Sequence, residues 1–433
     1  MAKNENKKEL QSVKGMRDMM GDQYYALQGF FEKAQEICEY YGLQPIETPT
    51  LEQEDVFLKG VGEGTDIAEK ELYSLKTKGR DKLAMRPETT AGIMRAYIEH
   101  GMHSKPQPVM FYTYGPVYRH DKPQRGRYRQ FWQFGVEILG STKTISDVMA
   151  IHLADLILKE SGIKDITLKI NSLGDSDSRK EYVKTLTAYY RKHVNKMGAT
   201  DRQRMKTNPL RILDSKDEKV IEINKEAPQS ISSLNTLSKK HFKEVLEHLD
   251  QLGIEYEIDH KLVRGLDYYS HTVFEFFTTP DKNEEGEELK PLALGGGGRY
   301  DYLAKIMGGK RDVPAVGFAF GVDRIIEATT KEIKPKVKKK PKVYFIQLGQ
   351  EAKLKSLAII EELRNAKIPV SHSLSKDGLS QQLAIAEKLG VTQVLIFGHK
   401  EALEGSVIVR TMKTRSQKTV AIDKLADYLK KTK

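Results

Sequence analysis

Residues 110–119 and 130–139 are both rich in aromatic and β-branched side chains, and a polar stretch containing Pro and Gly separates them. Runs of this kind joined by turn-forming residues are typical of paired strands. We therefore expect a long β-hairpin over residues 110–138. Its strands are too apolar for the whole hairpin to lie in solvent, so other layers must cover it.

The second strand of this hairpin has two unlike faces, because side chains alternate across a strand. One face is apolar and carries Trp132, Phe134, Val136 and Ile138. The opposite face carries Phe131, Gln133, Gly135 and Glu137. Gly135 leaves a gap between an amide and a carboxylate, which suits a small cationic ligand lying on the sheet. A solvated strand face with a glycine bulge is the other interpretation, and the spacing favours neither.

The stretch between the two strands is basic. Asp121 is its only acidic residue, against five cations: Arg119, Lys122, Arg125, Arg127 and Arg129. Such a cluster favours a phosphate group or the end of a nucleic acid, and Tyr128 adds a surface on which a base can stack. A solvated basic turn is the alternative, which the apolar flanking strands disfavour.

Four consecutive glycines, residues 295–298, precede Arg299-Tyr-Asp301. No G-x-x-x-x-G-K-[ST] sequence occurs, which excludes a phosphate-binding P-loop. We interpret the glycine run as a strand that passes close beneath a ligand. No H-E-x-x-H sequence and no cluster of histidines is present, so we expect no metal held by the protein itself.

Composition excludes several classes of protein. Hydrophobic residues make up 39% of the 433 residues, which is enough to build packed cores. The single cysteine rules out an intrachain disulfide and a cysteine-based zinc site. No apolar run approaches the ~18 residues of a membrane span, and the first residues show no signal peptide. We expect a cytoplasmic globular protein with no membrane partner, whose net charge of +11 is compatible with a polyanionic partner.

The hydrophobic pattern divides the chain into parts. Residues 24–41 predict a helix, and residues 165–260 a mostly helical insertion that interrupts a domain of residues 1–330. Seven lysines and two prolines in residues 331–342 predict a linker, which is either inert or follows phosphates. Alternating strands and helices over residues 343–433 predict a small α/β domain.

Several strings are similar to signatures of one family, the bacterial histidyl-tRNA synthetases, which are class II aminoacyl-tRNA synthetases. The most specific string is Arg264-Gly-Leu-Asp-Tyr-Tyr269. The other strings are residues 118–131 with Gln133 and Glu137, Arg86-Pro-Glu88, residues 208–216, residues 297–301 and residues 317–324. They follow the family's order over nearly the full length, so chance does not explain them.

The resemblance implies a fold and an activity. The fold is α/β (α+β): a class II antiparallel catalytic sheet of six or so strands with helices, a helical insertion, and a C-terminal mixed α/β anticodon-binding domain. The first helix and strand would form most of a homodimer interface. The activity is activation of L-histidine by ATP with Mg²⁺ to histidyl-adenylate, followed by transfer of histidine to the 3′-terminal adenosine of tRNA(His).

The resemblance also implies residue roles. Arg119 would hold the α-phosphate of ATP, Arg324 the γ-phosphate, and Arg264 would lie beside the reacting groups. Arg119, Arg264 and Gln133 are the implied catalytic residues. Histidine would be held by Glu88, Thr90, Gln133, Glu137, Tyr268, Tyr269 and Tyr300. The tRNA acceptor end would contact Gln124, Arg125 and Arg127. Whether Glu88 or Glu137 takes the imidazole, and which takes the α-ammonium, stays open.

Three positions depart from the family pattern. Thr89 stands where Gly is common, which would strain the backbone at a positive φ and disturb Thr90. Trp132 stands where His is frequent, and we expect it to face away from Gln133. Lys122 replaces a frequent Arg, which keeps a phosphate contact but loses bidentate geometry.

Two non-enzymes are the alternatives. A synthetase-like regulatory subunit of histidine biosynthesis would lack the C-terminal domain and have degraded catalytic strings. A nucleic-acid-binding regulator would use the fold without catalysis. The presence of Arg119, Arg264, Arg324 and residues 343–433 favours the synthetase over both.

Overall fold

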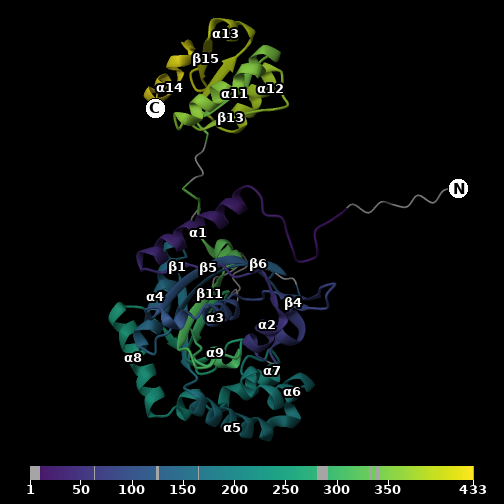
Figure 1. The fold of residues 1–433 in the computed structure, drawn as a ribbon, viewed down its shortest axis with the longest axis vertical. Coiled ribbons are helices and arrows are strands. Elements are labelled where there is room, and N and C mark those ends of the chain that lie inside the picture. Colours follow the sequence, from purple (N-terminus) through teal and green to yellow (C-terminus); the bar gives the residue numbers. More distant parts are fainter. Residues whose placement is uncertain are drawn as a thin grey trace, which may run out of the picture. The chain divides into compact units, whose positions relative to one another are not determined.

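The computed structural model describes residues 10–62, 64–122, 126–163, 165–279, 291–330, 333–336 and 341–432. The chain divides into two compact units, Met1–Pro335 and Lys336–Lys433. Figure 1 shows the elements of each unit.

The first unit is built on an eight-stranded sheet in the order β1-β5-β6-β11-β10-β9-β7-β8. Its six long strands are β5 (Val109–Tyr118), β6 (Gln130–Leu139), β7 (Ile166–Ser172), β9 (Ser270–Thr278), β10 (Ala293–Arg299) and β11 (Ala315–Gly321). Neighbouring long strands are all antiparallel. Short β1 (Gln44–Pro45) and β8 (Glu257–Ile258) pair in parallel at the two edges. The predicted hairpin is confirmed as β5 and β6.

One face of this sheet is covered by helices. They are α1 (Asp22–Tyr40), α4 (Thr144–Glu160), α8 (Thr236–Leu252) and α10 (Val322–Ala328), which share one apolar core with the strands. Phe134, Val136 and Ile138 are buried in that core, and Trp132 packs against it. The prediction for the apolar face of the second hairpin strand is therefore confirmed.

The other face is covered only in part. Helices α3 (Thr90–Glu99) and α9 (Leu303–Ile306) pack there with a second core. Beside them lie α2 (Glu54–Val61), a π-helical turn (Ile67–Glu71) and a small sheet in the order β2-β4-β3. The strands of that sheet are β2 (Leu51–Gln53), β3 (Ser74–Lys76) and β4 (Lys82–Met85). This second face carries the candidate site.

The helical segment is narrower than the predicted 165–260. Strands β7 and β8 at its two ends belong to the main sheet. Helix α8 packs on that sheet as well, because Phe242, Val245 and Leu249 form an apolar stripe that joins the main core. The elements with a core of their own are α5 (Ser176–His193), α6 (Ala199–Thr207) and α7 (Glu218–Ile223), with the short turns between them.

The second unit has a five-stranded sheet in the order β13-β12-β14-β15-β16. In chain order its elements are β12 (Val343–Gln347), α11 (Gln350–Asn365), β13 (Val370–His372), α12 (Leu379–Lys388), β14 (Gln393–Phe397), α13 (His399–Glu404), β15 (Ser406–Thr411), β16 (Gln417–Ala421) and α14 (Ile422–Lys431). The alternation read from the sequence is present. Helix α13 was not predicted from the sequence. Only Ala402 of its six residues is buried, so the helix has no apolar period that could reveal it.

Candidate active site

A strip of small residues crosses the partly covered face of the main sheet. Gly135 on β6 pairs with Ala319 on β11, which pairs with Gly296 on β10. Thr113 on β5 and Glu275 on β9 end the row. Backbone therefore forms the surface in the middle of the sheet, and functional side chains stand around it.

Glycines are required in this strip for two different reasons. A Cβ at Gly317 would overlap the carboxylate of Glu137, the residue opposite it on β6. At Gly296 and Gly297 a Cβ would overlap carbonyl oxygens of the adjacent strands, Phe274 and Gly317. A Cβ at Gly295 or Gly298 would likewise overlap the carbonyl oxygen of Ala319 or Thr272. Close packing of the strands thus explains all four glycines of residues 295–298, apart from any ligand.

Two buried carboxylates lie on one side of the strip. Glu88 accepts hydrogen bonds from the backbone N–H groups of Thr90 (2.7 Å) and Ala91 (2.9 Å) at the start of α3. Glu137 accepts from the Thr90 hydroxyl (2.6 Å) and from the Tyr300 hydroxyl. Thr90 therefore links the two acidic residues, which are only 4% and 2% exposed.

Burial raises the pKa of Glu137 to about 8, although the hydrogen bonds from Thr90 and Tyr300 oppose the shift. Burial also raises the pKa of Glu88, against the hydrogen bonds from Ala91 and Thr90. A buried carboxylate without a cationic partner is unfavourable in its charged form. A cationic ligand bound between the two would supply that partner.

Three tyrosines and an amide surround the carboxylates. The ring centroids of Tyr268 and Tyr269 are 4.6 Å apart, and those of Tyr268 and Tyr300 are 5.5 Å apart. Burial raises the pKa of each hydroxyl, so all three stay neutral donors. Gln133 is buried, and its Oε1 has no hydrogen-bond partner in the part of the chain that the structure describes. Since buried acceptors are normally satisfied, this oxygen indicates a missing donor.

Three arginines lie on the other side of the strip, each anchored through part of its guanidinium. Arg119 Nε donates to the carbonyl of Pro87 (2.9 Å). Arg324 donates to the carbonyls of Gly126 (2.9 Å) and Ala293 (2.8 Å). Within the described residues, their other N–H groups form no hydrogen bond and can therefore point at a ligand.

Arg264 is anchored differently, by a 2.6 Å ion pair with Glu275. Its Nε is buried and has no hydrogen-bond partner among the described residues. Glu275 was not predicted from the sequence as a site residue, although strand alternation over residues 271–277 places it on this face.

The three guanidinium groups act on one another electrostatically. Burial lowers the pKa of Arg119, and nearby Arg264 lowers it further, against the opposing effect of Glu71 and Glu88. Burial likewise lowers the pKa of Arg324, with Arg127 and Arg119 adding to it. Burial also lowers the pKa of Arg264, but the opposing effect of the Glu275 carboxylate is larger and holds that pKa above its ordinary value. Clustered, partly desolvated cations favour an anionic ligand.

Arg17 and Asp323 support the arginine side. Arg17 was not predicted from the sequence, whereas Asp323 lies within the string of residues 317–324 but was given no role. The Arg17 guanidinium pairs with Asp323 at 2.5 Å and lies 3.8 Å above the ring of Tyr128. Asp323 also accepts from the backbone N–H of Trp132 (2.9 Å) and directly precedes Arg324. No periodic pattern could have marked Arg17, because it lies in a segment before the first helix.

Asp267 joins the helical segment to the catalytic string. Its Oδ1 accepts from Arg179 (2.6 Å) and Asn208 (2.8 Å). Because Asp267 lies between Arg264 and Tyr268, these contacts fix the loop that carries both. Asp267 is part of the string identified in the sequence, but its partners could not be read from it.

The departures from the family pattern are accommodated. Thr89 has φ −103°, so its β-branched side chain causes no strain and Thr90 keeps its place. The ring centroids of Trp132 and Phe31 are 5.8 Å apart, so Trp132 lies on the face of the strand away from Gln133, as predicted. Lys122 is exposed.

Of the residues expected at the tRNA acceptor end, Arg127 pairs with Asp121 at 2.9 Å. Gln124 and Arg125 lie outside the described residues. Within the described ranges, no group of three or more His, Cys, Asp or Glu side chains is arranged to hold a metal ion. No helix in the described part of the chain is long and apolar enough to cross a membrane.

Comparisons with known proteins agree with this geometry. The family model for histidyl-tRNA synthetase matches residues 15–325, and that for an anticodon binding domain matches residues 342–432. A histidine–tRNA ligase of Thermosipho melanesiensis is 41% identical over 406 residues, covering 94% of both chains. One of Acetivibrio thermocellus is 37% identical over 421 residues, covering 97% of this chain and 99% of its own.

Solved structures are similar over nearly the whole chain. The crystal structure of apo S. aureus histidyl-tRNA synthetase has a TM-score of 0.79 at 29% identity and covers 98% of this chain and 100% of its own. A Bacillus halodurans structure, described as an ATP phosphoribosyltransferase regulatory subunit/histidyl-tRNA synthetase, has a TM-score of 0.63 at 21% identity, covering 90% and 98%. That second likeness shows the fold alone.

The antiparallel sheet flanked by helices, with its separate C-terminal sheet, is the architecture of a class II aminoacyl-tRNA synthetase. Within that class, the extent of the family match is decisive. The chain belongs to the histidyl-tRNA synthetase family.

Proposed function

We propose that this protein activates L-histidine with ATP and transfers it to the 3′-terminal adenosine of tRNA(His). One observation carries the proposal: two buried carboxylates, which form no ion pair within the described residues, stand beside three arginines around a single strip of bare backbone. A molecule with a cationic end and a nucleoside triphosphate are the pair of ligands that would neutralise both sides.

Histidine recognition would use the buried acceptors. Glu88 and Glu137 face the α-ammonium and the imidazole, and the unpartnered Oε1 of Gln133 accepts from an N–H of the ligand. A different amino acid would leave at least one buried acceptor unpaired. Each unpaired buried polar group costs about 1–3 kcal/mol, which is about one to two powers of ten in selectivity. Sites built to pair a substrate's polar groups reject analogues that lack them by about 10⁴–10⁵, so no editing step is needed.

Activation joins two anions, so charge has to be neutralised. An oxygen of the histidine carboxylate attacks the α-phosphorus of ATP, and the bond to the departing pyrophosphate breaks. Arg119 would hold the α-phosphate, Arg324 the γ-phosphate, and Arg264 would lie at the point where negative charge gathers. Rigid, permanently charged forks provide positioning and electrostatic stabilisation, which is most of what phosphoryl chemistry requires.

Magnesium would enter on the triphosphate of ATP and neutralise part of its charge. In the second step the terminal ribose hydroxyl of the tRNA attacks the carbonyl carbon of histidyl-adenylate, and AMP leaves. Arg127, with Gln124 and Arg125, would contact the acceptor end, and residues 343–433 would bind the anticodon. A homodimer in the cytoplasm completes the proposal, in keeping with a role in translation.

The direct test is charging. The purified full-length protein, given ATP, tRNA and one labelled amino acid at a time, should form aminoacyl-tRNA with histidine alone. A chain ending at residue 330 should keep adenylate formation and lose most of the charging. Charging with another amino acid, or none by folded protein, would overturn the proposal.

A further inference from the structure

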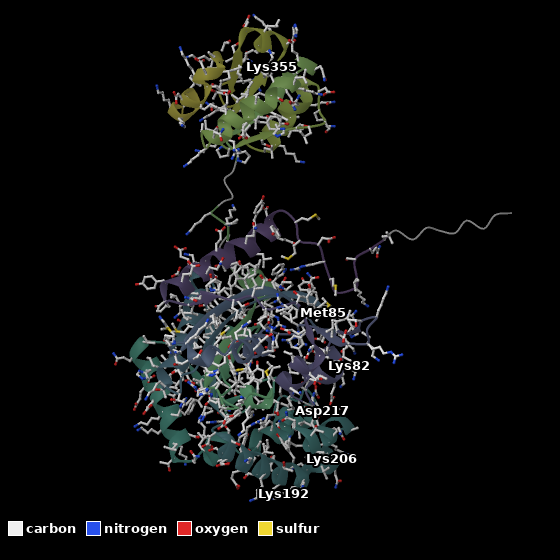
Figure 2. The ribbon with its side chains drawn as sticks, viewed as in Figure 1. Lys82, Met85, Lys192, Lys206, Asp217 and Lys355 are labelled. Atoms are coloured by element: carbon white, nitrogen blue, oxygen red, sulfur yellow. The ribbon has the colours of Figure 1, made fainter. Side chains whose placement is uncertain are left out.

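The hairpin formed by β3 and β4 concentrates positive charge at its tip. Residues 76–82 carry four cations: Lys76, Lys78, Arg80 and Lys82. All four are exposed. Asp81 is the only acidic residue among them, and its carboxylate accepts a hydrogen bond from the Thr77 hydroxyl at 2.8 Å. Lys82 is labelled in Figure 2, near Met85 on the same strand.

The cations and the backbone conformation at the tip destabilise the hairpin itself. Lys76 lies directly opposite Lys82 in the antiparallel register, and like charges in that position are destabilising. Arg80 has φ 70°, a left-handed conformation that residues with a Cβ rarely adopt. Within the described residues, no carboxylate forms an ion pair with any of the four cations. Local rules broken without compensation in the free protein are typical of functional sites.

The base of the hairpin is fixed to the basic loop that follows β5. The backbone N–H of His120 donates to the carbonyl of Glu71 (2.7 Å). The rings of Tyr73 and His120 pack edge to face, with centroids 5.6 Å apart. His120 directly follows Arg119 and precedes the loop that contains Arg127. The base of the hairpin is therefore held beside Arg119, where that basic loop begins.

We propose that this hairpin is a second phosphate-binding surface for the acceptor arm of tRNA, which acts beside the basic loop. The inference rests on the proposed function. Lysines on flexible stems contact phosphates without reading bases, so the hairpin contributes affinity and no sequence specificity. Such contacts make binding dependent on salt, because each neutralised phosphate releases counterions.

The test uses a triple variant of the full-length protein: Lys78→Gln, Arg80→Gly and Lys82→Gln. Glycine suits the left-handed conformation at position 80, and losing Lys82 relieves the repulsion from Lys76, so the variant should fold at least as stably as the wild type. The matched control is Lys239→Gln, Lys240→Gln and Lys243→Gln on α8. These lysines are exposed. Helix α8, which carries them, lies on the opposite side of the first unit from β4 in Figure 1, and the control variant removes the same charge.

The hairpin variant should have a KM for tRNA about tenfold above that of the wild type. Its plot of log affinity against log salt should be less steep, with a slope smaller in magnitude by about 2–3. Histidine-dependent pyrophosphate exchange should stay at the wild-type level, and the α8 control should match the wild type throughout. A hairpin variant that charges tRNA with the control's KM and salt slope would overturn the inference and leave the proposed function standing. A dimer weakened in sedimentation, with tRNA affinity unchanged, would overturn it too and indicate a contact between copies. Absence of charging by the wild type would instead refute the proposed function.

Discussion

The two sides of the candidate site are built on different principles. On the carboxylate side, the acidic groups are already oriented by protein hydrogen bonds, as when Thr90 contacts both Glu88 and Glu137. On the arginine side, Arg119 and Arg324 are anchored to backbone carbonyls by part of each fork. In the proposed roles, a small cation would be recognised by buried acceptors that are already oriented, whereas an anion would be held by guanidinium groups that the protein anchors only in part.

Each side is electrostatically unfavourable without its ligand. Glu137 is buried and forms no ion pair within the described residues, and Arg119 and Arg324 have their pKa values lowered by neighbouring arginines. The two sides also interact, because Glu88 raises the pKa of Arg119. Ligands that neutralise both sides would relieve both penalties, which is a physical reason for the site to hold histidine and ATP together.

The largest effect is expected on the arginine side. Arg264→Ala should reduce histidine-dependent pyrophosphate exchange at least about 1,000-fold, or about 4 kcal/mol of transition-state stabilisation, because it removes charge where the reacting anions meet. Histidine binding without ATP should change by less than about threefold. Titration calorimetry and exchange rates separate the two.

Because Arg264→Ala also leaves Glu275 unpaired, the double variant Arg264→Ala, Glu275→Gln is the control. It should be as inactive as the single variant. Exchange within about tenfold of wild type in either variant would mean that Arg264 serves only to pair Glu275.

A smaller loss is expected on the carboxylate side. Glu137→Gln should weaken histidine binding about 100-fold and leave the KM for ATP unchanged, because an amide cannot neutralise a cation.

The folding stability of Glu137→Gln should change in the opposite direction, as a gain relative to the wild type. The folded-state pKa of Glu137, about 8, lies above its ordinary value of 4.5, so the wild type loses stability as the pH rises through about 8. Thermal unfolding should show the melting temperature of the variant rising relative to that of the wild type as the pH increases from about 4.5 to about 8. A difference in melting temperature that does not change with pH would contradict the burial of an uncompensated charge.

The pH dependence of binding sharpens the comparison. The ratio of histidine affinities, wild type over Glu137→Gln, should rise with pH up to about 8, by at most about tenfold per unit, because only the ionised carboxylate attracts the cation. Taking the ratio cancels the titration of histidine itself. A ratio that is flat across this range would place the recognition elsewhere.

The smallest effect is expected from Arg17, to which the proposed function assigns no contact with either ligand. Arg17→Gln should raise the KM for ATP by about three- to tenfold with little change in kcat or histidine affinity, because Arg17 positions Tyr128 and Asp323 beside Arg324. Arg17→Lys should rescue part of the loss, since it keeps the charge but not the planar stacking. Equal losses in ATP and histidine affinity would show that Arg17 stabilises the whole unit instead.

The faces of each single strand could be predicted from the sequence better than the pairing between strands. A period of two fixed the faces of residues 132–138, and both Trp132 and Gln133 lie where it placed them. That period does not say which strands pair, so the strip joining Gly135 to Gly296 through Ala319 depends on contacts between distant segments. Family strings supplied the arginines and tyrosines, whereas their supports did not follow from any local pattern.

Exchange of labelled pyrophosphate into ATP, measured with each standard amino acid in turn, tests most directly whether the two sides work as one site. The account predicts rapid exchange with histidine and none above background with the others, before any tRNA is added. Folded protein that binds ATP but shows no histidine-dependent exchange would contradict it.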